Sequence, residues 1–109
     1  MPDLSISVAV ASLLGSEQRL ETFLRRNAAP LARFDELILV IQGVRRDRFS
    51  GSAADTMIRA LAPQARVFAM AEFGIGRSRN LALEQATGDY LWFLDDDVEV
   101  EPAAFESFA

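Results

Sequence analysis

Four short apolar runs alternate with amphipathic segments along the chain. Each run is rich in β-branched or aromatic residues and ends at glycine, proline or polar residues, as is typical of buried strands. We therefore predict four strands, over residues 5–11, 36–41, 66–70 and 90–94. The second run is almost continuously apolar, so we expect this strand to be central and covered on both faces.

The segments between these runs have the periodicity of amphipathic helices. Ser16 can cap the first helix, whose apolar residues fall on one face at spacings of three and four: Leu20, Phe23 and Leu24. A polar, arginine-rich stretch over residues 44–52 is expected to be a loop. Ser52 followed by Asp55 resembles a capping box at the start of the second helix, which Pro63 ends.

A third helix is predicted over residues 81–86, with residues 74–80 as the loop that leads into it and Gly88 at its C-cap. A further helix is expected to begin after Pro102. Strict alternation of strands and helices favours an α/β fold, with a Rossmann-like, mostly parallel sheet flanked by helices. The length allows one domain, so we assign residues 1–109 to a single α/β domain.

Composition narrows the chemistry that this chain can carry. The sequence has no cysteine and no histidine, so disulfides, thiolate ligands and imidazole ligands are excluded and any metal must be held by oxygen. The net charge of -5 disfavours nonspecific nucleic-acid binding. Neither a secretory signal nor an apolar run of bilayer length is visible. We expect a cytoplasmic protein, with a peripheral position at the inner membrane face as the alternative.

Three consecutive carboxylates follow the fourth predicted strand. Asp95, Asp96 and Asp97 repel one another, so a fold that gathers them needs a cation or strong hydrogen bonds to compensate. Ligands of open α/β sheets bind beyond the carboxyl ends of the strands. We expect the three carboxylates at the end of a central strand, facing Ser12. Hard carboxylate oxygens suit magnesium or manganese, and a solvated acidic loop is the alternative reading of this triplet alone.

Other motifs carry weaker signals. The stretch Gly74-Ile75-Gly76 begins a dinucleotide-binding pattern, but Arg79 replaces its last glycine and the stretch follows the third strand, which disfavours a dinucleotide fold. A calcium loop after the fourth strand would lack the glycine that its sharp turn needs. The arginines of the loop, Arg45, Arg46 and Arg48, could meet phosphate or an anionic acceptor, and the alternative is a solvated surface.

The motifs together resemble the inverting nucleotide-sugar glycosyltransferases of family 2, which have the GT-A fold. Their N-terminal halves share a hydrophobic first strand, a glutamate-led second strand, an arginine-asparagine pair, a glycine before an aromatic strand, and a DxD motif followed by a proline. The matching positions here are Ile6 to Val10, Glu36 to Val40, Arg79-Asn80, Gly88-Asp89-Tyr90, Phe93 to Asp97, and Pro102. The resemblance covers nearly the whole chain.

The resemblance implies roles for the aspartates. Asp95 and Asp97 occupy the DxD motif, where the first contacts the nucleotide ribose and the last holds a divalent ion, Mn²⁺ or Mg²⁺, that bridges the diphosphate. We assign both of them to the metal, and we assign Asp95 with the intervening Asp96 to substrate binding. A bound cation would stabilise the charge that grows on the leaving nucleoside diphosphate.

The resemblance also places residues around the nucleotide. Ala11 and Ser12 fall where the family has a proline and a threonine, in the floor beneath the base. Arg79 falls where an arginine contacts the nucleotide, and the alternative is that it braces the acidic loop. The expected partners are a nucleotide-sugar donor, with a UDP-sugar as the first expectation, and a glycan, lipid or small-molecule acceptor.

This sequence departs from the family pattern at two places. An acidic residue that reads the nucleobase commonly follows the second strand, whereas residues 41–43 are Ile-Gln-Gly here, so the choice of uridine is in doubt. Gln42 can offer an amide to the base or simply serve the turn. The family's catalytic aspartate base has no counterpart within the 109 residues, so we assign no catalytic residue and expect the domain to be truncated at its C-terminal end.

Two functions are therefore compatible with the sequence. The first is a metal-dependent glycosyltransferase, and the alternative is a non-catalytic nucleotide-binding fragment or interaction module that lacks the acceptor half. A phosphoacceptor signalling domain is disfavoured because no acidic pair follows the first strand and the chain has no lysine. Exposed apolar surface on a last partial helix, with Phe105 and Phe108, would favour a homodimer.

Overall fold

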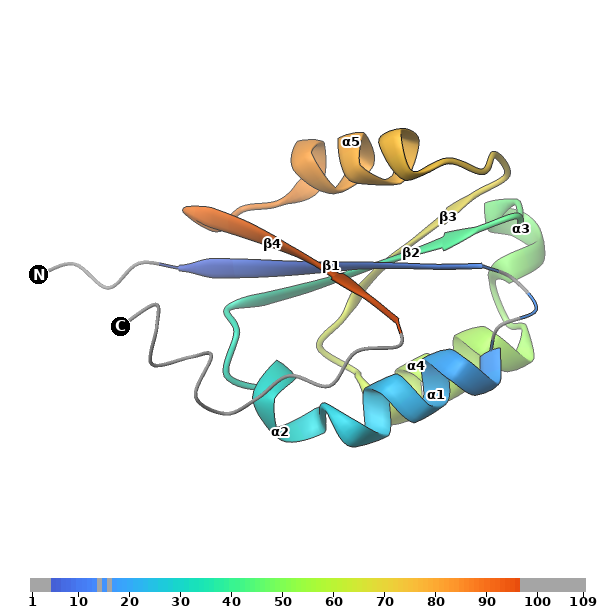
Figure 1. Ribbon diagram of the computed structural model, residues 1–109. Helices are drawn as coiled ribbons and strands as arrows, with labels where there is room; N and C mark the ends of the chain where they lie inside the picture. Colours follow the sequence, from blue (N-terminus) through green and yellow to red (C-terminus); the bar gives the residue numbers. More distant parts are fainter. Residues whose placement is uncertain (1–4, 14, 16, 97–109) are drawn as a thin grey trace, which may run out of the picture.

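The computed structural model describes residues 5–13, 15 and 17–96 of the chain. Within them, four strands form one parallel sheet in the order β3-β2-β1-β4 (Figure 1). The strands are β1 (Ile6–Leu13), β2 (Glu36–Gln42), β3 (Arg66–Met70) and β4 (Tyr90–Asp95). The parallel sheet confirms the predicted fold class, and every predicted strand is present.

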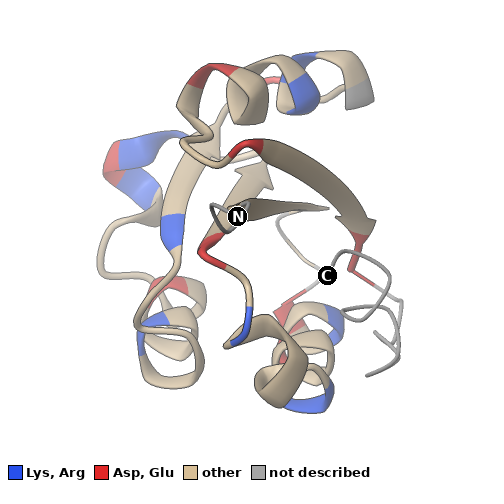
Figure 2. Cartoon of the chain, turned by 90° about the vertical axis from the view of Figure 1, so that its left-hand side faces the viewer, with Lys and Arg blue, Asp and Glu red and all other residues tan. Residues whose placement is uncertain are grey.

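Helices cover both faces of this sheet (Figures 1 and 2). On one face lie α1 (Glu17–Arg26), α2 (Ala28–Leu31) and α4 (Ala53–Leu61), and on the other lies α5 (Ile75–Gln85). The chain steps outward from β1 through β2 to β3, and then α5 carries it back across the sheet to the other side of β1. The strand order therefore reverses beside β1, and the crevice between the ends of β1 and β4 is the topological switch point.

The core follows the alternation of side chains along the two inner strands. Val8 and Leu39 belong to a cluster with α1 and α4, whereas Ala9 and Ile38 belong to a smaller cluster with α5. Every residue of β2 after Glu36 is buried, which confirms that this strand is central and covered on both faces. The two layers thus hold β1 and β2 rigidly in the middle of the domain.

The helices differ from the prediction in extent. The expected loop over residues 44–52 contains a single helical turn, α3 (Arg46–Phe49), which is anchored by the buried side chain of Phe49. The predicted loop over residues 74–80 is mostly helical, because α5 begins directly after Gly74. The capping box was predicted correctly in part: the Ser52 hydroxyl accepts a hydrogen bond from the backbone N–H of Asp55. Ser16 and the helix expected after Pro102 lie outside the described residues.

At the amino end of the sheet, Glu36 links three strands and the segment after α5. Its carboxylate accepts hydrogen bonds from the Ser7 hydroxyl at 2.9 Å, the Thr87 backbone N–H at 2.9 Å and the Arg66 guanidinium at 2.7 Å. Arg66 also donates to the backbone oxygen of Gln85. Burial acts to raise the pKa of the Glu36 carboxyl, but these hydrogen bonds outweigh it and hold the pKa below its usual value.

Gly88 packs directly against Ser7 of β1. Its N–H donates to the Ser7 hydroxyl at 2.9 Å, and a Cβ atom on Gly88 would lie 2.6 Å from that oxygen and 2.9 Å from the Ser7 nitrogen. The prediction that Gly88 is the C-cap of the third helix was wrong, because α5 ends at Gln85 and Ala86 is its C-cap. The glycine is needed for contact between segments, not for a helix end.

Candidate functional site

The predicted acidic site lies at the switch point of the sheet. Asp95 is the last residue of β4 and pairs in register with Ala11 of β1, and the acidic segment follows the β4 arrowhead in Figure 2. Within the described sheet β4 is an edge strand, so the expectation that these aspartates end a central strand was wrong. Of the two aspartates of this triplet that the structure describes, Asp96 makes the expected contact with Ser12, the next-to-last residue of the adjacent central strand β1, whereas Asp95 lies on the opposite face.

Asp96 is held by β1 and α1. Its side chain is largely buried, and its Oδ2 accepts a hydrogen bond of 2.8 Å from the Ser12 hydroxyl, which is itself buried. Its Oδ1 lies 3.7 Å from the Arg19 guanidinium on α1. Both carboxylate oxygens therefore face partners from this chain, which compensates the charge that the triplet of aspartates brings together.

Asp95 lies on the opposite face of the sheet and is exposed. It lines a cavity of about 50 Å³ together with Ala11, Ser78 and Arg79. The Arg79 guanidinium carbon lies 5.2 Å from the ring centroid of Phe93, a cation–π distance. Because successive residues of a strand point to opposite faces, the two aspartates have different surroundings: Asp95 is accessible, whereas Asp96 is engaged.

Gln42 organises the neighbouring strand end. Its side-chain Oε1 accepts a hydrogen bond of 2.8 Å from the backbone N–H of Gly74, the residue before α5. Gly43, with a φ of 89°, turns the chain directly after it and donates from its N–H to the carbonyl of Met70 at 2.7 Å. The side chain of Gln42 is buried, and it connects the end of β2 to the start of α5.

Most predicted site residues lie together on this edge. Ala11, Ser12, Arg79, Asp95 and Asp96 all surround the ends of β1 and β4. The predicted metal ligand Asp97 lies outside the described residues. Among residues 5–13, 15 and 17–96, no group of three or more acidic side chains is arranged to hold an ion.

Sequence reasoning missed two contacts at this site. The ion pair of Arg19 with Asp96 depends on how α1 packs, which periodicity alone does not give. The hydrogen bond from Gly74 to Gln42 had a partial signal, since an amide at the end of a buried strand needs a partner.

A larger cavity, of about 700 Å³, lies along the β3 edge. None of the predicted site residues lines it. Of the three arginines that we considered for anion binding, Arg46 lines this cavity, whereas Arg45 and Arg48 do not.

In open α/β sheets, ligands bind beyond the carboxyl ends of the strands at the switch point, which is where Asp95 and Asp96 lie in this domain. The chain matches Glycosyl transferase family 2 over residues 7–109, and it belongs to that family. This confirms the resemblance found in the sequence.

Among solved structures, the chain is similar to TarS residues 1–349 from S. aureus, with a TM-score of 0.63 and 22% identity. The match covers 95% of this chain and 31% of that chain, so this chain spans about a third of the length of TarS in that structure. At this identity the likeness concerns the fold. No match was found among the curated proteins. Within the described residues, no helix combines the length and apolar character needed to cross a membrane.

Proposed function

We propose that this chain is the donor-binding domain of a metal-dependent glycosyltransferase, which binds a nucleotide-diphospho-sugar and transfers its sugar to a glycan, lipid or small-molecule acceptor. The observation that carries the proposal is a contrast between two aspartates at the switch point. The carboxylate of Asp95 is exposed, whereas that of Asp96 is bound within the protein. Membership of the family supports the reaction class. We treat residues 1–109 as one domain of this enzyme.

The residues at this edge suit a hard divalent cation. Asp95 presents an exposed carboxylate, and oxygen ligands are what Mg²⁺ and Mn²⁺ prefer. The charge of the adjacent Asp96 is compensated within the protein by Ser12 and Arg19. We assign Asp95 and Asp97 as the residues that would hold the ion. When bound, the ion would neutralise negative charge on the departing nucleoside diphosphate.

The side chains around Asp95 have separate tasks in this proposal. Ala11 contributes only a methyl group, which leaves space beside the end of β1 for a flat ligand. Arg79 offers a guanidinium to the ribose or the diphosphate, and its position over Phe93 keeps the charge near the cavity that Asp95 lines. We assign no base for the acceptor hydroxyl.

Calorimetry with uridine diphosphate tests the proposal. The nucleotide should bind more tightly in the presence of Mn²⁺ or Mg²⁺ than with a chelator, and Asp97→Asn should remove most of this gain, because a neutral amide loses the charge that holds the ion. Asp47→Asn is the matched control, since Asp47 is an exposed aspartate on α3 that pairs only loosely with Arg45 at 3.5 Å. Equal metal dependence in all three proteins would refute the assignment.

A further inference from the structure

The strand β3 forms an open edge of the sheet. Among the described residues it pairs with β2 alone. The carbonyl of Met70 accepts from Gly43, which follows β2, so Met70 directs its backbone groups toward β2. In a parallel ladder alternate residues face the same neighbour, so the N–H and C=O groups of Val67 and Ala69 point away from the sheet. Such outward groups are a template for another strand.

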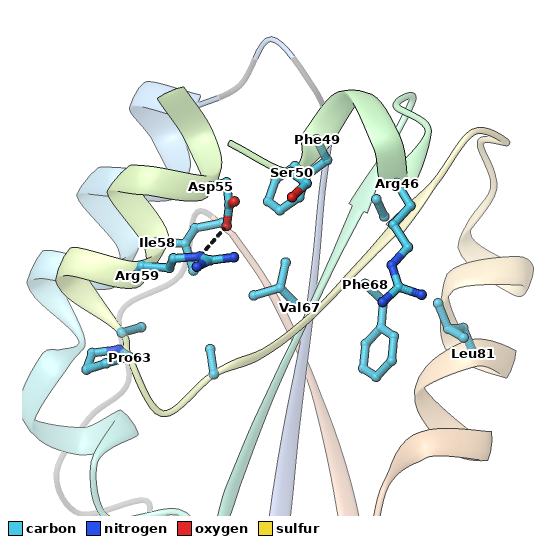
Figure 3. A pocket seen from close by; sticks show the side chains of 13 residues that line it. Arg46, Phe49, Ser50, Asp55, Ile58, Arg59, Pro63, Val67, Phe68 and Leu81 are labelled. Atoms are coloured by element: carbon cyan, nitrogen blue, oxygen red, sulfur yellow. Dashed lines mark hydrogen bonds and ion pairs between the residues drawn. The ribbon is translucent and has the colours of Figure 1, made fainter. Parts of the chain in front are cut away.

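The cavity of about 700 Å³ follows this edge (Figure 3). Val67, Phe68 and Ala69 form its floor, with Ile58 of α4 on one side and Leu81 of α5 on the other. These three β3 residues are only partly buried, although their partners on β2 are fully buried. Both helical layers thus cover β3 only in part, and α3 also contacts this strand, so apolar surface remains partly exposed along its edge.

Two arginines flank the exposed edge, one on each side. Figure 3 shows the Arg46 side chain beside Phe68 and Leu81, toward α5, and the Arg59 side chain on α4 across β3. Arg46 forms no ion pair with any residue that the structure describes. Arg59 pairs with Asp55 at 2.9 Å.

The acidic residue in this cavity offsets the charge of Arg59 but not that of Arg46. The Asp55 carboxylate already accepts from Arg59 and from the backbone N–H of Gly51 at 2.8 Å. Both Asp55 oxygens are therefore bonded within the protein, whereas the guanidinium of Arg46 is available to an anion in the cavity. The net charge of -5 gives no long-range attraction for an acidic ligand, so recognition here would depend on the local arginines.

We propose that the β3 edge binds an extended acidic segment of a partner protein, which adds to the sheet as a strand beside β3. Its backbone would pair with the outward groups of Val67 and Ala69. Because an extended strand sends consecutive side chains to opposite faces, neighbouring acidic residues would reach Arg46 on one face and Arg59 on the other. A second copy of this chain is a poorer occupant, since β3-to-β3 pairing would bring the arginines of both copies together.

A labelled peptide tests this proposal on the full chain. The probe is an eight-residue peptide with blocked ends that repeats a block of two aspartates and two valines, and its binding is followed by fluorescence anisotropy. We expect saturable binding that Arg46→Glu weakens by roughly tenfold or more. The matched control is Arg48→Glu on the same helix, because Arg48 does not line the cavity, and it should change binding by less than about twofold.

Two further measurements separate strand addition from simple charge attraction. Ala69→Pro removes an outward N–H without removing a hydrogen bond to β2, so it should abolish binding while the circular dichroism spectrum is kept. A probe with N-methylated valines should also fail to bind, and this result does not depend on the stability of any variant.

Four results would overturn the proposal. These are no binding of the acidic probe, equal losses in Arg46→Glu and Arg48→Glu, equal binding of a probe with lysine in place of aspartate, and unchanged binding of the N-methylated probe. A dimer that Ala69→Pro converts to a monomer would instead assign this edge to a second copy. Loss of this surface leaves the proposed donor site untouched, so the two proposals fail separately.

Discussion

The Ser12 hydroxyl donates a hydrogen bond to Asp96 Oδ2 over 2.8 Å and joins the ends of two neighbouring strands that are 84 positions apart in the chain. Both side chains are buried, and Arg19 adds an ion pair from α1. This contact holds the end of β4 against β1, and with it the backbone that carries Asp95. Asp96 is therefore a positioning residue in the proposed donor site.

Substitution of Asp96 should lower stability, whereas substitution of Asp95 should remove ligand binding. Asp96→Ala leaves the buried Ser12 hydroxyl without its acceptor, so we expect the free energy of unfolding to fall by about 1–3 kcal/mol. Asp95→Ala removes an exposed carboxylate and should change stability by less than about 0.5 kcal/mol. Metal-dependent nucleotide binding should be lost in Asp95→Ala. Urea denaturation and calorimetry measure the two effects.

Asp96→Ala also removes a charge that repels the neighbouring aspartates, and this acts against the loss of stability. Asp96→Asn separates the contribution of the charge from that of the hydrogen bond. The amide keeps an oxygen that can accept from Ser12 but carries no charge. It should therefore be more stable than Asp96→Ala. If the alanine and asparagine variants were equally stable, the hydrogen bond from Ser12 would not contribute to holding β4.

Gly88→Ala should destabilise the protein, because its Cβ would lie 2.6 Å from the Ser7 hydroxyl oxygen and 2.9 Å from the Ser7 backbone nitrogen. The backbone nitrogen cannot move without disturbing β1, so we expect a loss of about 1–3 kcal/mol in urea denaturation. Gly76→Ala is the matched control, since nothing lies within 4 Å of the added Cβ on α5. That control should be stabilised by about 0.5–1 kcal/mol. Equal stabilities of the two variants would show that the contact with Ser7 relaxes freely.

Glu36 should make stability dependent on pH on the acid side. Its pKa is below the ordinary value of 4.5 in the folded protein. A group with a depressed folded pKa stabilises the fold above its unfolded pKa, and this contribution is lost as the pH falls through the folded pKa. The unfolding free energy should therefore fall below about pH 4.5, and Glu36→Gln should flatten this part of the profile. Parallel acid profiles for the two proteins would exclude Glu36 as a source of the dependence.

The strand pattern was predictable because burial on both faces leaves a continuous apolar run, as from Leu37 to Ile41. The beginning of α5 was not, because glycine, serine and arginine around Gly76 have loop composition. Their helical state depends on tertiary contacts such as the burial of Ser78 and Ala82 against the sheet.

The site was predictable to the level of residue type but not of orientation. Three adjacent aspartates indicate a site, yet the surroundings of each one depend on the register in which β4 pairs with β1. A slip of one residue in this pairing would exchange the faces of Asp95 and Asp96. The contact of Arg19 similarly needs the position of α1, which no local pattern specifies.

Gln42 fixes the start of α5 through a hydrogen bond of 2.8 Å, which its Oε1 accepts from the Gly74 N–H. Gln42→Leu keeps a similar volume in the buried position but removes the acceptor, so the segment before α5 loses its link to β2. Because Gly74 is exposed, water can replace part of the bond, and we expect a loss of about 1 kcal/mol. Amide hydrogen exchange should accelerate in the first turn of α5 more than in its last turn. Gln42→Glu retains an acceptor oxygen near the positive end of α5 and should remain closer to the unsubstituted protein at neutral pH. Uniform acceleration across α5, or none at all, would show that packing and not Gln42 fixes the start of this helix.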